Sequence, residues 1–432
     1  MDIISIIDKK RNNLELTKEE IDFFVTNFTK GKIPNYQASA LLMAICINGM
    51  TKNETYYLTY SMQNSGQTLN LNKTLGVFVD KHSTGGVSDS TTIPLMSIIS
   101  CAGLKSIKMS GAGLGFTGGT FDKLKVFPNI DLQYDIGIDD ERIEKYGIMY
   151  CTQAKNIAPA DKKIYALRDV TGTVQSIPLI ASSIMSKKLA CNSDVIFLDI
   201  KCGNGAFMHK ISEAKKLAKT MIDIGKSAGK TMGAVISDMN QPLGNGIGCA
   251  LEVLDGINVL KGKKSPLATL TKILAINMLV LSKKYTETQA TSFVNKVISS
   301  GEAYTRFKQI ITAQGGDISI IDLLEKEYKP DFIVCAPSSG YLKSYDTSGL
   351  GYLVRDMGGG RLQENEEIDH YCGIKLRKKI GDTVKQSEAL FEVYLGNKLT
   401  KEEVVERLNS LYEIVNSKKP PTPPVLVYDY IK

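Results

Sequence analysis

The residues best suited to chemistry lie in the stretch VDKHSTGGVSDS, residues 79–90. It places a histidine, one of three in the 432-residue chain, beside a lysine, several hydroxyl groups and a pair of glycines. Glycine allows a backbone to pass close to a ligand, and Lys81, Ser83 and the hydroxyls that follow as far as Thr92 are hydrogen-bond donors. This combination predicts an anion site, with His82 beside the group that the anion attacks.

A second glycine-rich stretch, KMSGAGLGFTGGTFDK, covers residues 108–123. Its hydroxyl residues Ser110, Thr117 and Thr120 surround glycine backbone that can form a nest of N–H groups. Such a nest suits a single phosphate. The Walker pattern GxxxxGK[ST], which cradles nucleoside triphosphates, does not occur in the chain.

The same stretch also spells GxGxxG through Gly113, Gly115 and Gly118. This is the dinucleotide fingerprint, which requires an acidic residue at the end of the next strand. Asp139 and Asp140 have the right spacing, but they stand in GIDDERIEKYG, which reads as the start of a helix. An NAD-dependent oxidoreductase therefore rests on the glycine pattern alone.

A third group of polar residues comes from the region 164–190. Ser183 and Lys187 are four residues apart, so on a helix they share one face. Together with Arg168 they can bind a planar ring rich in carbonyl acceptors. The stretch DIKCGNGAFMHK adds Lys201 and His209, which we expect to be solvated. The chain has no pair of carboxylates in a pattern that would indicate hydrolysis. It also has no Ser/His/Asp or Cys/His order that would indicate acyl transfer.

Composition is that of a globular protein, with 43% hydrophobic and 23% charged residues. No apolar run is long enough to cross a membrane, and the N-terminus has no signal-peptide core, so we expect a cytoplasmic protein. The eight cysteines form no CxxC pair and no zinc-ligand spacing. A net charge of +7 leaves a nucleic-acid-binding protein as an alternative, although a solvated surface with an anion site explains it as well.

The elements that must position these residues fall into three parts. Residues 1–66 read as helices, one of which starts with a capping box from Thr17 to Glu20. Residues 67 to about 325 alternate short apolar strands, glycine loops and helices, the signature of an α/β domain with a mostly parallel sheet. The helical stretch within about 162–192 is predicted to return to the first unit. The cleft between the two units is then the expected ligand site.

The third part, residues 331–432, is predicted to be an α+β domain. GYLVRDMGGGRL and IDHYCGIKLRKKIGDTVKQSEALFEVYLG read as short strands, followed by a helix with a capping box from Thr400 to Glu403. The proline-rich tail KKPPTPPVLVYDY is predicted to be extended. IGDTVKQSEALFEV resembles the small β-sandwich that carries biotin or lipoate, but it offers no evident modifiable lysine, so we interpret this domain as structural. The predicted domains are 1–66 plus about 162–192, 67–161 plus 193–330, and 331–432.

Four long motifs resemble the thymidine and pyrimidine-nucleoside phosphorylases. They are VDKHSTGGVSDSTT, KMSGAGLGFTGGTFDKL, YALRDVTGTVQSIPLIASSIMSKKLA and QPLGNGIGCALEV, in the order of that family. The resemblance extends over essentially the whole chain. It implies a small all-α lobe, a larger α/β lobe, a C-terminal α+β domain, and a homodimer formed through the α lobe.

The resemblance also implies a reaction and its residues. The reaction is reversible phosphorolysis, in which a pyrimidine nucleoside and phosphate give free base and pentose 1-phosphate, as in nucleoside salvage. His82, Arg168 and Lys187 are the implied catalytic residues. By motif match the phosphate-binding residues are Lys81, Ser83, Thr92, Lys108, Ser110 and Thr120, and the base-binding residues are His82, Arg168, Ser183 and Lys187.

The identity of residue 108 bears on the sugar. Thymidine-restricted members of the family tend to have methionine there, whereas broader ones have lysine, and an ammonium can accommodate a ribose 2′-hydroxyl. Lys108 therefore favours an enzyme for uridine, thymidine and deoxyuridine over a thymidine-restricted one.

Several residues depart from the family pattern. Ala112 stands where arginine is usual, Phe116 where histidine is usual, and Lys125 where glutamate is usual. No organic cofactor is implied, but the family has a monovalent-cation site, and we expect potassium there. The matching positions are Ser88, Ser90, Leu243, Gly246 and Asp255, with serine at 88 in place of glycine.

A phosphoribosyltransferase of related fold is a closer rival than the oxidoreductase or the nucleic-acid-binding protein. It would need sites for a diphosphate and its magnesium. The acidic cluster expected for that metal is not visible in the glycine loops.

Overall fold

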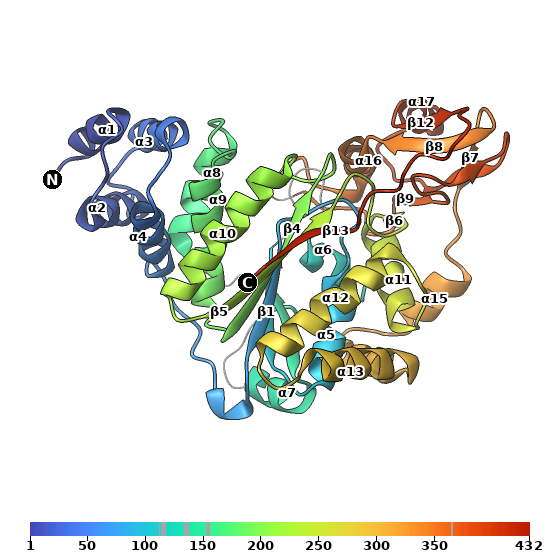
Figure 1. Ribbon diagram of the computed structural model, residues 1–432, viewed down its shortest axis with the longest axis horizontal. Coiled ribbons are helices and arrows are strands. Elements are labelled where there is room, and N and C mark those ends of the chain that lie inside the picture. The colour runs from blue at the N-terminus through green and yellow to red at the C-terminus, as the bar shows by residue number, and fades with distance from the viewer. Residues whose placement is uncertain (112, 114–117, 134–137, 153–155, 364–365) are drawn as a thin grey trace.

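The computed structural model describes residues 1–111, 113, 118–133, 138–152, 156–363 and 366–432. The positions Ala112, Phe116, Thr117 and Gly115, named above, lie outside these residues. Three parts are visible along the chain: a helical lobe, a central α/β lobe and a C-terminal α+β domain (Figure 1). Among the described residues, no helix combines the length and the apolar character needed to cross a membrane.

The helical lobe is built mainly from the N-terminal segment. Its first helices are α1 (Ile3–Arg11), α2 (Lys18–Thr29), α3 (Asn35–Asn48) and α4 (Lys52–Gln63), joined later in the chain by α8 (Pro159–Asp169) and α9 (Ile177–Ala190). The predicted capping box of Thr17 and Glu20 is present at the start of α2. α8 contributes Ile164 and Leu167 to the apolar core of this lobe. The chain thus leaves the lobe after α4 and comes back to it.

The central sheet has the strand order β1-β4-β5-β13. Its strands are β1 (Val79–Ser83), β4 (Val195–Cys202), β5 (Thr231–Asp238) and β13 (Val427–Ile431), of which the first three are parallel and β13 is antiparallel. A parallel pair, β2 (Ser106–Ser110) and β3 (Ile148–Thr152), lies beside β1, where Phe78 and Lys105 form an isolated parallel bridge. The glycine loops follow the carboxyl ends of β1, β2 and β4, at one edge of the sheet, as predicted.

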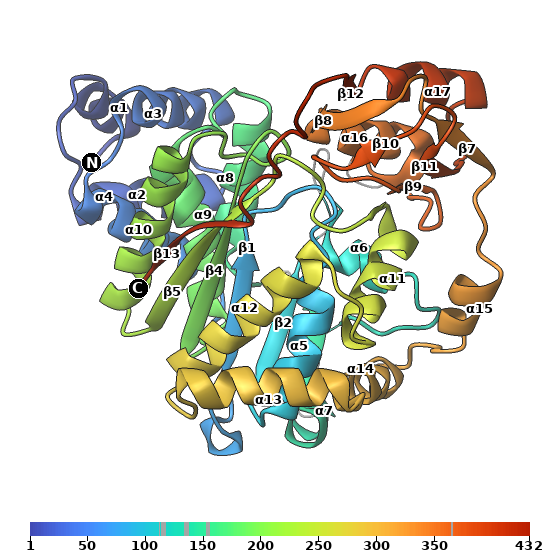
Figure 2. The same cartoon turned by 45° about the vertical axis from the view of Figure 1, so that its right-hand side comes forward.

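Helices cover both faces of the sheet (Figures 1 and 2). A large apolar core joins the sheet to helices on one face, and a second core joins β4 and β5 to α9 and α10 on the other. The remaining helices of this lobe are α5 (Thr92–Cys101), α6 (Thr120–Leu124), α7 (Ile138–Tyr146), α10 (Ile211–Ser227), α11 (Cys249–Leu260), α12 (Pro266–Leu281), α13 (Glu287–Ser299), α14 (Glu302–Ala313) and α15 (Ile320–Lys326), with a short 3-10 turn η1 (Lys73–Leu75). α9 contacts both lobes, since Leu179 belongs to the helical-lobe core and Met185 to the core under the sheet.

The C-terminal domain contains two antiparallel sheets, ordered β6-β9-β11-β7 and β10-β8-β12. The elements are β6 (Gly246–Ile247), β7 (Phe332–Cys335), β8 (Gly340–Tyr345), α16 (Thr347–Val354), a π-helical turn η2 (Arg355–Gly359), β9 (Gly373–Leu376), β10 (Thr383–Val384), β11 (Ala389–Tyr394), α17 (Lys401–Asn409) and β12 (Tyr412–Val415). β6 comes from the α/β lobe, so this domain is attached to the loop between β5 and α11. The capping box of Thr400 and Glu403 is present at α17.

The prediction of strands in GYLVRDMGGGRL was wrong, because α16 and η2 cover most of this stretch. The Asp346 side chain caps the helix by accepting a hydrogen bond from the Gly349 N–H at 2.9 Å. Leu350, Leu353 and Val354 then point into the core of the C-terminal domain at helical spacing. Burial of this face outweighs the local preference of valine and tyrosine for strands.

Candidate active site

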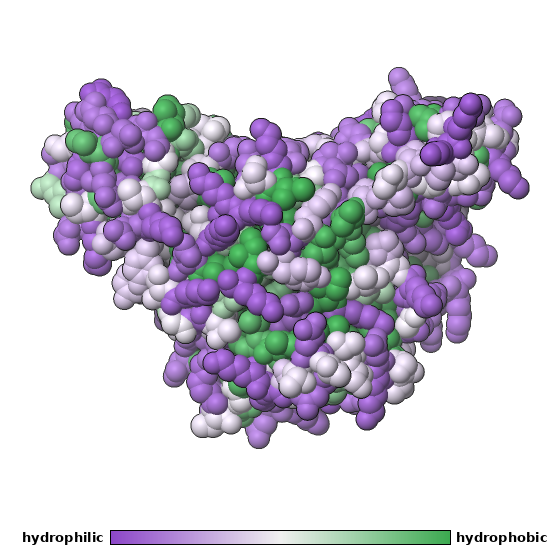
Figure 3. Space-filling model, in the orientation of Figure 1, coloured by the Kyte–Doolittle hydropathy of each residue, from purple (hydrophilic) through white to green (hydrophobic). Residues whose placement is uncertain are grey.

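The predicted site residues meet in one cleft of about 450 Å³ between the helical and α/β lobes. The space-filling view shows the molecule hollowed at the top, between the helical lobe and the C-terminal domain (Figure 3). The lining includes nearly all the residues that the motifs indicated: His82, Ser83, Thr92, Lys108, Ser110, Thr120, Arg168, Ser183 and Lys187. Lys81 is the one that does not line it. The anion loops and the base-binding residues therefore face the same space.

The loop after β1 is organised by Asp89. One carboxylate oxygen of Asp89 accepts the Ser83 hydroxyl at 2.6 Å, and the other accepts the Thr91 hydroxyl at 2.6 Å. Burial opposes the charge of Asp89, but Lys201 and Lys81 hold the pKa of this carboxyl well below its ordinary value. Asp89 therefore stays ionised and fixes the hydroxyls at both ends of the loop. It stands inside the first glycine-rich motif, but no pattern in the sequence indicates this role.

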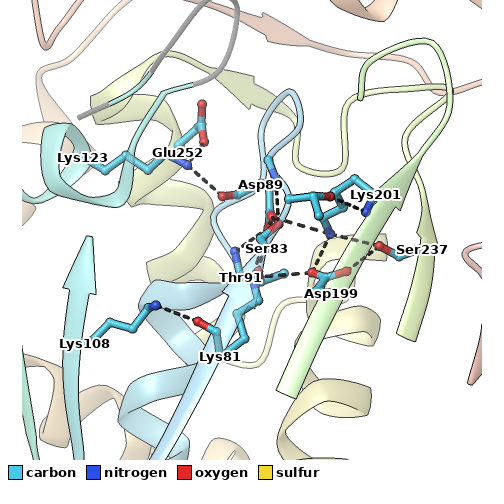
Figure 4. A network of polar contacts seen from close by, with 12 residues as sticks. Lys81, Ser83, Asp89, Thr91, Lys108, Lys123, Asp199, Lys201, Ser237 and Glu252 are labelled. Atoms are coloured by element: carbon cyan, nitrogen blue, oxygen red, sulfur yellow. Dashed lines mark hydrogen bonds and ion pairs between the residues drawn. The ribbon is translucent and has the colours of Figure 1, made fainter. Parts of the chain in front are cut away.

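The Lys81 ammonium is buried in an ion network rather than exposed to the cleft (Figure 4). It donates to the Thr91 hydroxyl at 2.8 Å and lies 3.5 Å from a carboxylate oxygen of Asp199 and 3.7 Å from one of Asp89. In this arrangement Lys81 reaches the anion loop through Thr91 and Asp89. Direct binding of phosphate by Lys81 stays a prediction.

Lys201 belongs to the same network, and the expectation that it is solvated was wrong. Its side chain is fully buried, with the ammonium 2.7 Å from Asp199 and 3.6 Å from Asp89. The hydroxyl of Ser237 lies 3.1 Å from the ammonium and donates to Asp199 at 2.6 Å. Two lysines and two aspartates thus balance one another under the anion loop. His209, in contrast, is exposed.

Lys108 lies on the floor of the cleft, in the middle of β2. Its ammonium donates to the backbone carbonyl of Lys81 at 2.6 Å and lies 3.2 Å from Asp80, which also binds Lys188 at 2.8 Å. Burial lowers the pKa of Lys108 to about 8, even though Asp80 acts in the opposite direction. A mildly alkaline solution therefore removes the charge of Lys108.

His82 is the neutral imidazole of the cleft. Desolvation, followed by the positive charges of Lys188 and Lys108, holds the pKa of His82 well below its ordinary value. At neutral pH the ring therefore has one N–H donor and one unprotonated nitrogen, which can accept a hydrogen bond. His82 can donate a hydrogen bond to a leaving group, but it carries no charge while it does so.

The second anion loop joins β2 to α6. Ser110, Gly111, Gly113, Gly118 and Thr120 line the cleft, with Thr120 in the first turn of α6. Lys123, in the same short helix, holds this turn in place. It donates to the backbone carbonyl of Asp89 at 2.7 Å and pairs with Glu252 at 2.6 Å. The two anion loops are therefore tied together through α6. The helix itself is five residues long, unlike the long helix that opens a dinucleotide-binding unit.

The opposite wall of the cleft carries the planar, cationic guanidinium group of Arg168. Arg168, at the end of α8, is buried and donates to the backbone carbonyls of Thr173, Val174 and Leu179 at 2.9–3.1 Å. These bonds use three of the five guanidinium N–H groups, so donors remain for a ligand. Since the fork is held by rigid backbone groups, Arg168 is preorganised for a flat polar ring.

Ser183 and Lys187 share one face of α9, as their spacing predicted. The Lys187 ammonium donates to the Ser183 hydroxyl at 3.3 Å and forms an ion pair with Asp161, which lies in the first turn of α8. Asp161 was not found from the sequence, because it is 26 residues from Lys187 and no local pattern connects them. Ile180, Ile184 and Phe207 add apolar surface beside these polar groups.

The residues predicted for potassium gather behind the first anion loop. Ser88 has a left-handed backbone, φ 60°, which explains why glycine is usual there. The Ser90 hydroxyl is buried without a hydrogen-bond partner, and Asp255 accepts the backbone N–H of Gly246 at 2.8 Å. The Ser88 hydroxyl and the Asp255 carboxylate lie together beside Gly244, and oxygen ligands of this type suit a hard monovalent cation. The Lys379 ammonium donates to the Gly244 carbonyl at 2.6 Å, so this segment already binds one positive charge. The Leu243 backbone is held beside them, since its N–H donates to the Val87 carbonyl at 3.3 Å.

Comparison with known proteins agrees with this geometry. Residues 4–66 match the helical bundle domain of a glycosyl transferase family, and residues 75–304 match the a/b domain of that family. Residues 341–415 match the C-terminal domain of pyrimidine nucleoside phosphorylases. The pyrimidine-nucleoside phosphorylase of Geobacillus stearothermophilus is 44% identical over 438 residues, which cover 100% of both chains. This chain belongs to the pyrimidine-nucleoside phosphorylase family.

Other relatives agree with this assignment. The pyrimidine-nucleoside phosphorylase of Staphylococcus haemolyticus is 43% identical over 98% of both chains. Anthranilate phosphoribosyltransferase from Thermus thermophilus shares the fold alone, with a TM-score of 0.59 and 16% identity over 72% of this chain and 99% of that one. The chain is therefore a glycosyltransferase of the pyrimidine-nucleoside phosphorylase family, whose substrates are a nucleoside and phosphate.

Proposed function

We propose that this enzyme catalyses the reversible phosphorolysis of uridine, thymidine and deoxyuridine to free base and pentose 1-phosphate, in the cytoplasmic salvage of nucleosides. The observation that carries the proposal is that the two anion loops and the Arg168–Lys187 wall line one cleft. Phosphate bound at the loops faces a base bound at the wall. The sugar between them is then exposed to attack at C1′.

The charges on the two sides match the charges that develop in the reaction. As the glycosidic bond breaks, the base becomes negative at its carbonyl oxygens, and Arg168 and Lys187 can stabilise that charge. His82, which is neutral, donates a hydrogen bond to the departing base. The sugar becomes positive, and the phosphate acts as both nucleophile and counter-charge. Closure of the lobes would bring the reactants together and exclude water.

Phosphate is assigned to Ser83, Thr92, Ser110 and Thr120, with Lys81 and Lys108 nearby. All four hydroxyls line the cleft. Asp89 accepts the hydroxyl of Ser83, and Thr120 lies in the first turn of α6. Lys108 supplies a cation on the cleft floor, where it can reach either phosphate or a ribose 2′-hydroxyl. This placement supports a broad rather than a thymidine-restricted enzyme.

Potassium is assigned to Ser88, Ser90, Leu243, Gly246 and Asp255. When bound there, the ion would supply a positive charge that fixes the first anion loop against the segment 243–246. Since this segment includes the start of β6, the ion would also join the loop to the C-terminal domain.

A homodimer formed through the helical lobe is supported by exposed apolar side chains on α3. Tyr36 and Ile47 are 74% and 75% exposed, and Met43 lies between them on the same helical face. Figure 3 shows hydrophobic side chains on the helical lobe where Figure 1 places α3. Such a patch is characteristic of a protein–protein contact.

The deciding experiment follows free base released from uridine, thymidine and cytidine, with and without phosphate. We expect release from uridine and thymidine that depends on phosphate. Release without phosphate would make the protein a hydrolase, and release from thymidine and deoxyuridine but not uridine would make it thymidine-restricted. The variant Lys108→Met should lower the rate on uridine relative to thymidine. An unchanged ratio would remove Lys108 from sugar selection.

A further inference from the structure

An ion pair joins the C-terminal domain to α6, the helix that follows the second anion loop. Arg361, which follows η2, places a guanidinium nitrogen 2.7 Å from a carboxylate oxygen of Asp122 in α6. The Asp122 side chain is 2% exposed and that of Arg361 is 20% exposed. The two residues are 239 positions apart in the sequence, so the contact joins the two domains.

The other carboxylate oxygen of Asp122 holds the anion loop itself. It accepts the backbone N–H of Gly113 at 2.6 Å. Gly113 lines the cleft, as does Thr120, which begins the same turn of α6. One carboxylate therefore joins the C-terminal domain, the first turn of α6 and the glycine loop.

The neighbouring residue extends this connection to the first anion loop. Lys123 donates to the carbonyl of Asp89, whose side chain fixes the Ser83 and Thr91 hydroxyls. The first turn of α6 is thus a junction between both loops. Arg361 of the C-terminal domain contacts the Asp122 side of that junction, and it is not among the described residues that line the cleft.

We propose that Arg361 is a positioning residue for phosphate, which it helps to bind by holding Asp122 and, through it, the backbone of the second anion loop. This inference rests on the proposed function, in which Ser110 and Thr120 hold phosphate. It gives the C-terminal domain, interpreted from the sequence as structural, a part in the affinity for one substrate. The buried carboxylate needs this partner, because an ionised group left without one in the interior is strongly unfavourable.

The test compares the KM values for phosphate and for uridine in the full-length enzyme. Arg361→Ala should raise the phosphate KM about tenfold, as expected for a lost charged hydrogen bond, with little change in the uridine KM. Arg361→Lys should recover part of the affinity, because a lysine can still pair with Asp122. The control is Arg407→Ala, which breaks an ion pair of 2.8 Å with Asp356 inside the C-terminal domain and should change neither KM.

Two further variants make the result decisive. Asp122→Asn should raise the phosphate KM, and the double variant with Arg361→Ala should raise it no further, since both act through one contact. Additive effects, or an equal fall in both affinities with a lower unfolding temperature, would overturn the proposal.

The variant Thr120→Ala tests the assignment of the phosphate site, on which the proposal for Arg361 rests. If Thr120→Ala leaves the phosphate KM unchanged, the proposed phosphate site is wrong. If it raises that KM while Arg361→Ala does not, the role of Arg361 alone is wrong.

Discussion

The carboxylate of Asp161, in the first turn of α8, binds the ammonium of Lys187 on α9. The Asp161 side chain is buried, whereas that of Lys187 is 28% exposed to the cleft. The aspartate therefore acts as the fixed partner and the lysine as the group presented to a ligand. This ion pair therefore fixes α8 relative to α9 at the cleft.

Asp161→Asn should lower kcat by about tenfold, the effect of removing one charged hydrogen bond, because Lys187 would lose its fixed position. Lys187→Ala should cost more, about a hundredfold, since it removes a donor to the leaving base. Steady-state kinetics on uridine would measure both. Asp169→Asn, at the exposed end of the same helix, is the control. Equal activity of Asp161→Asn and the unaltered enzyme would contradict the role of this pair.

Phosphate binding should weaken as pH rises through about 8. The pKa of Lys108 is about 8, so its charge is present below that pH and lost above it. We expect the phosphate KM to rise by up to about tenfold between pH 7 and 9. Lys108→Arg keeps its charge over this range and should show a flatter profile. The same steep rise in the arginine variant would show that another group titrates.

Asp89→Asn should destabilise the protein and weaken phosphate binding together. The substitution leaves Lys81 and Lys201 with Asp199 as their carboxylate partner in the network, which should lower the free energy of unfolding by about 3 kcal/mol. Because the folded-state pKa of Asp89 is depressed, its contribution is fully present above pH 3.8 and is lost as the pH falls through the lower folded value. Urea unfolding at pH 7 would measure the difference. A variant as stable as the original would mean that the network carries no such energy.

Potassium should stabilise the folded protein if the assigned site binds it. The unfolding temperature should be higher in potassium chloride than in choline chloride of the same ionic strength. Ser90→Ala removes the unpartnered hydroxyl and should reduce that difference. Identical unfolding temperatures in the two salts would argue against a cation at this position.

Ile47→Glu should dissociate the proposed dimer. A carboxylate at the C-terminal end of the exposed apolar face of α3 would be buried without a partner in the interface. Analytical ultracentrifugation should then show one chain per particle in place of two. Leu323→Glu, the same kind of change at an exposed leucine on α15, should leave the association unchanged. A dimer that persists with Ile47→Glu would place the interface elsewhere.

Much of the architecture could be predicted, because helix starts and strand ends are marked by residues next to them in the sequence. The capping boxes at Thr17 and Thr400 mark real helix starts, and the glycine loops follow strand ends. The strand prediction for residues 351–362 was wrong because burial against a distant core, rather than local preference, makes most of that segment helical. The secondary structure of a short apolar segment depends on what the segment packs against.

The ligand-facing residues of the site could be predicted from motifs, but their partners could not. Asp161 and Arg361 act on residues 26 and 239 positions away, and nothing in the sequence connects such pairs. The sequence does carry a signal for the burial of Lys201. It alternates with Asp199 in a strand that is buried throughout, and two opposite charges at that spacing point to the same side of a strand. Their burial together indicates an internal ion pair.

Strand β13 completes the edge of the central sheet beside β5, after the chain has passed through the whole C-terminal domain (Figure 2). Tyr428 on β13 donates to Asp238 on β5 at 2.6 Å, across 190 residues of sequence. During translation β5 therefore emerges long before its partner, and its hydrogen-bonding edge stays open in the nascent chain. An unpaired strand edge is a template for wrong association. Synthesis of the C-terminal domain is thus the interval in which misassembly of this protein competes with folding.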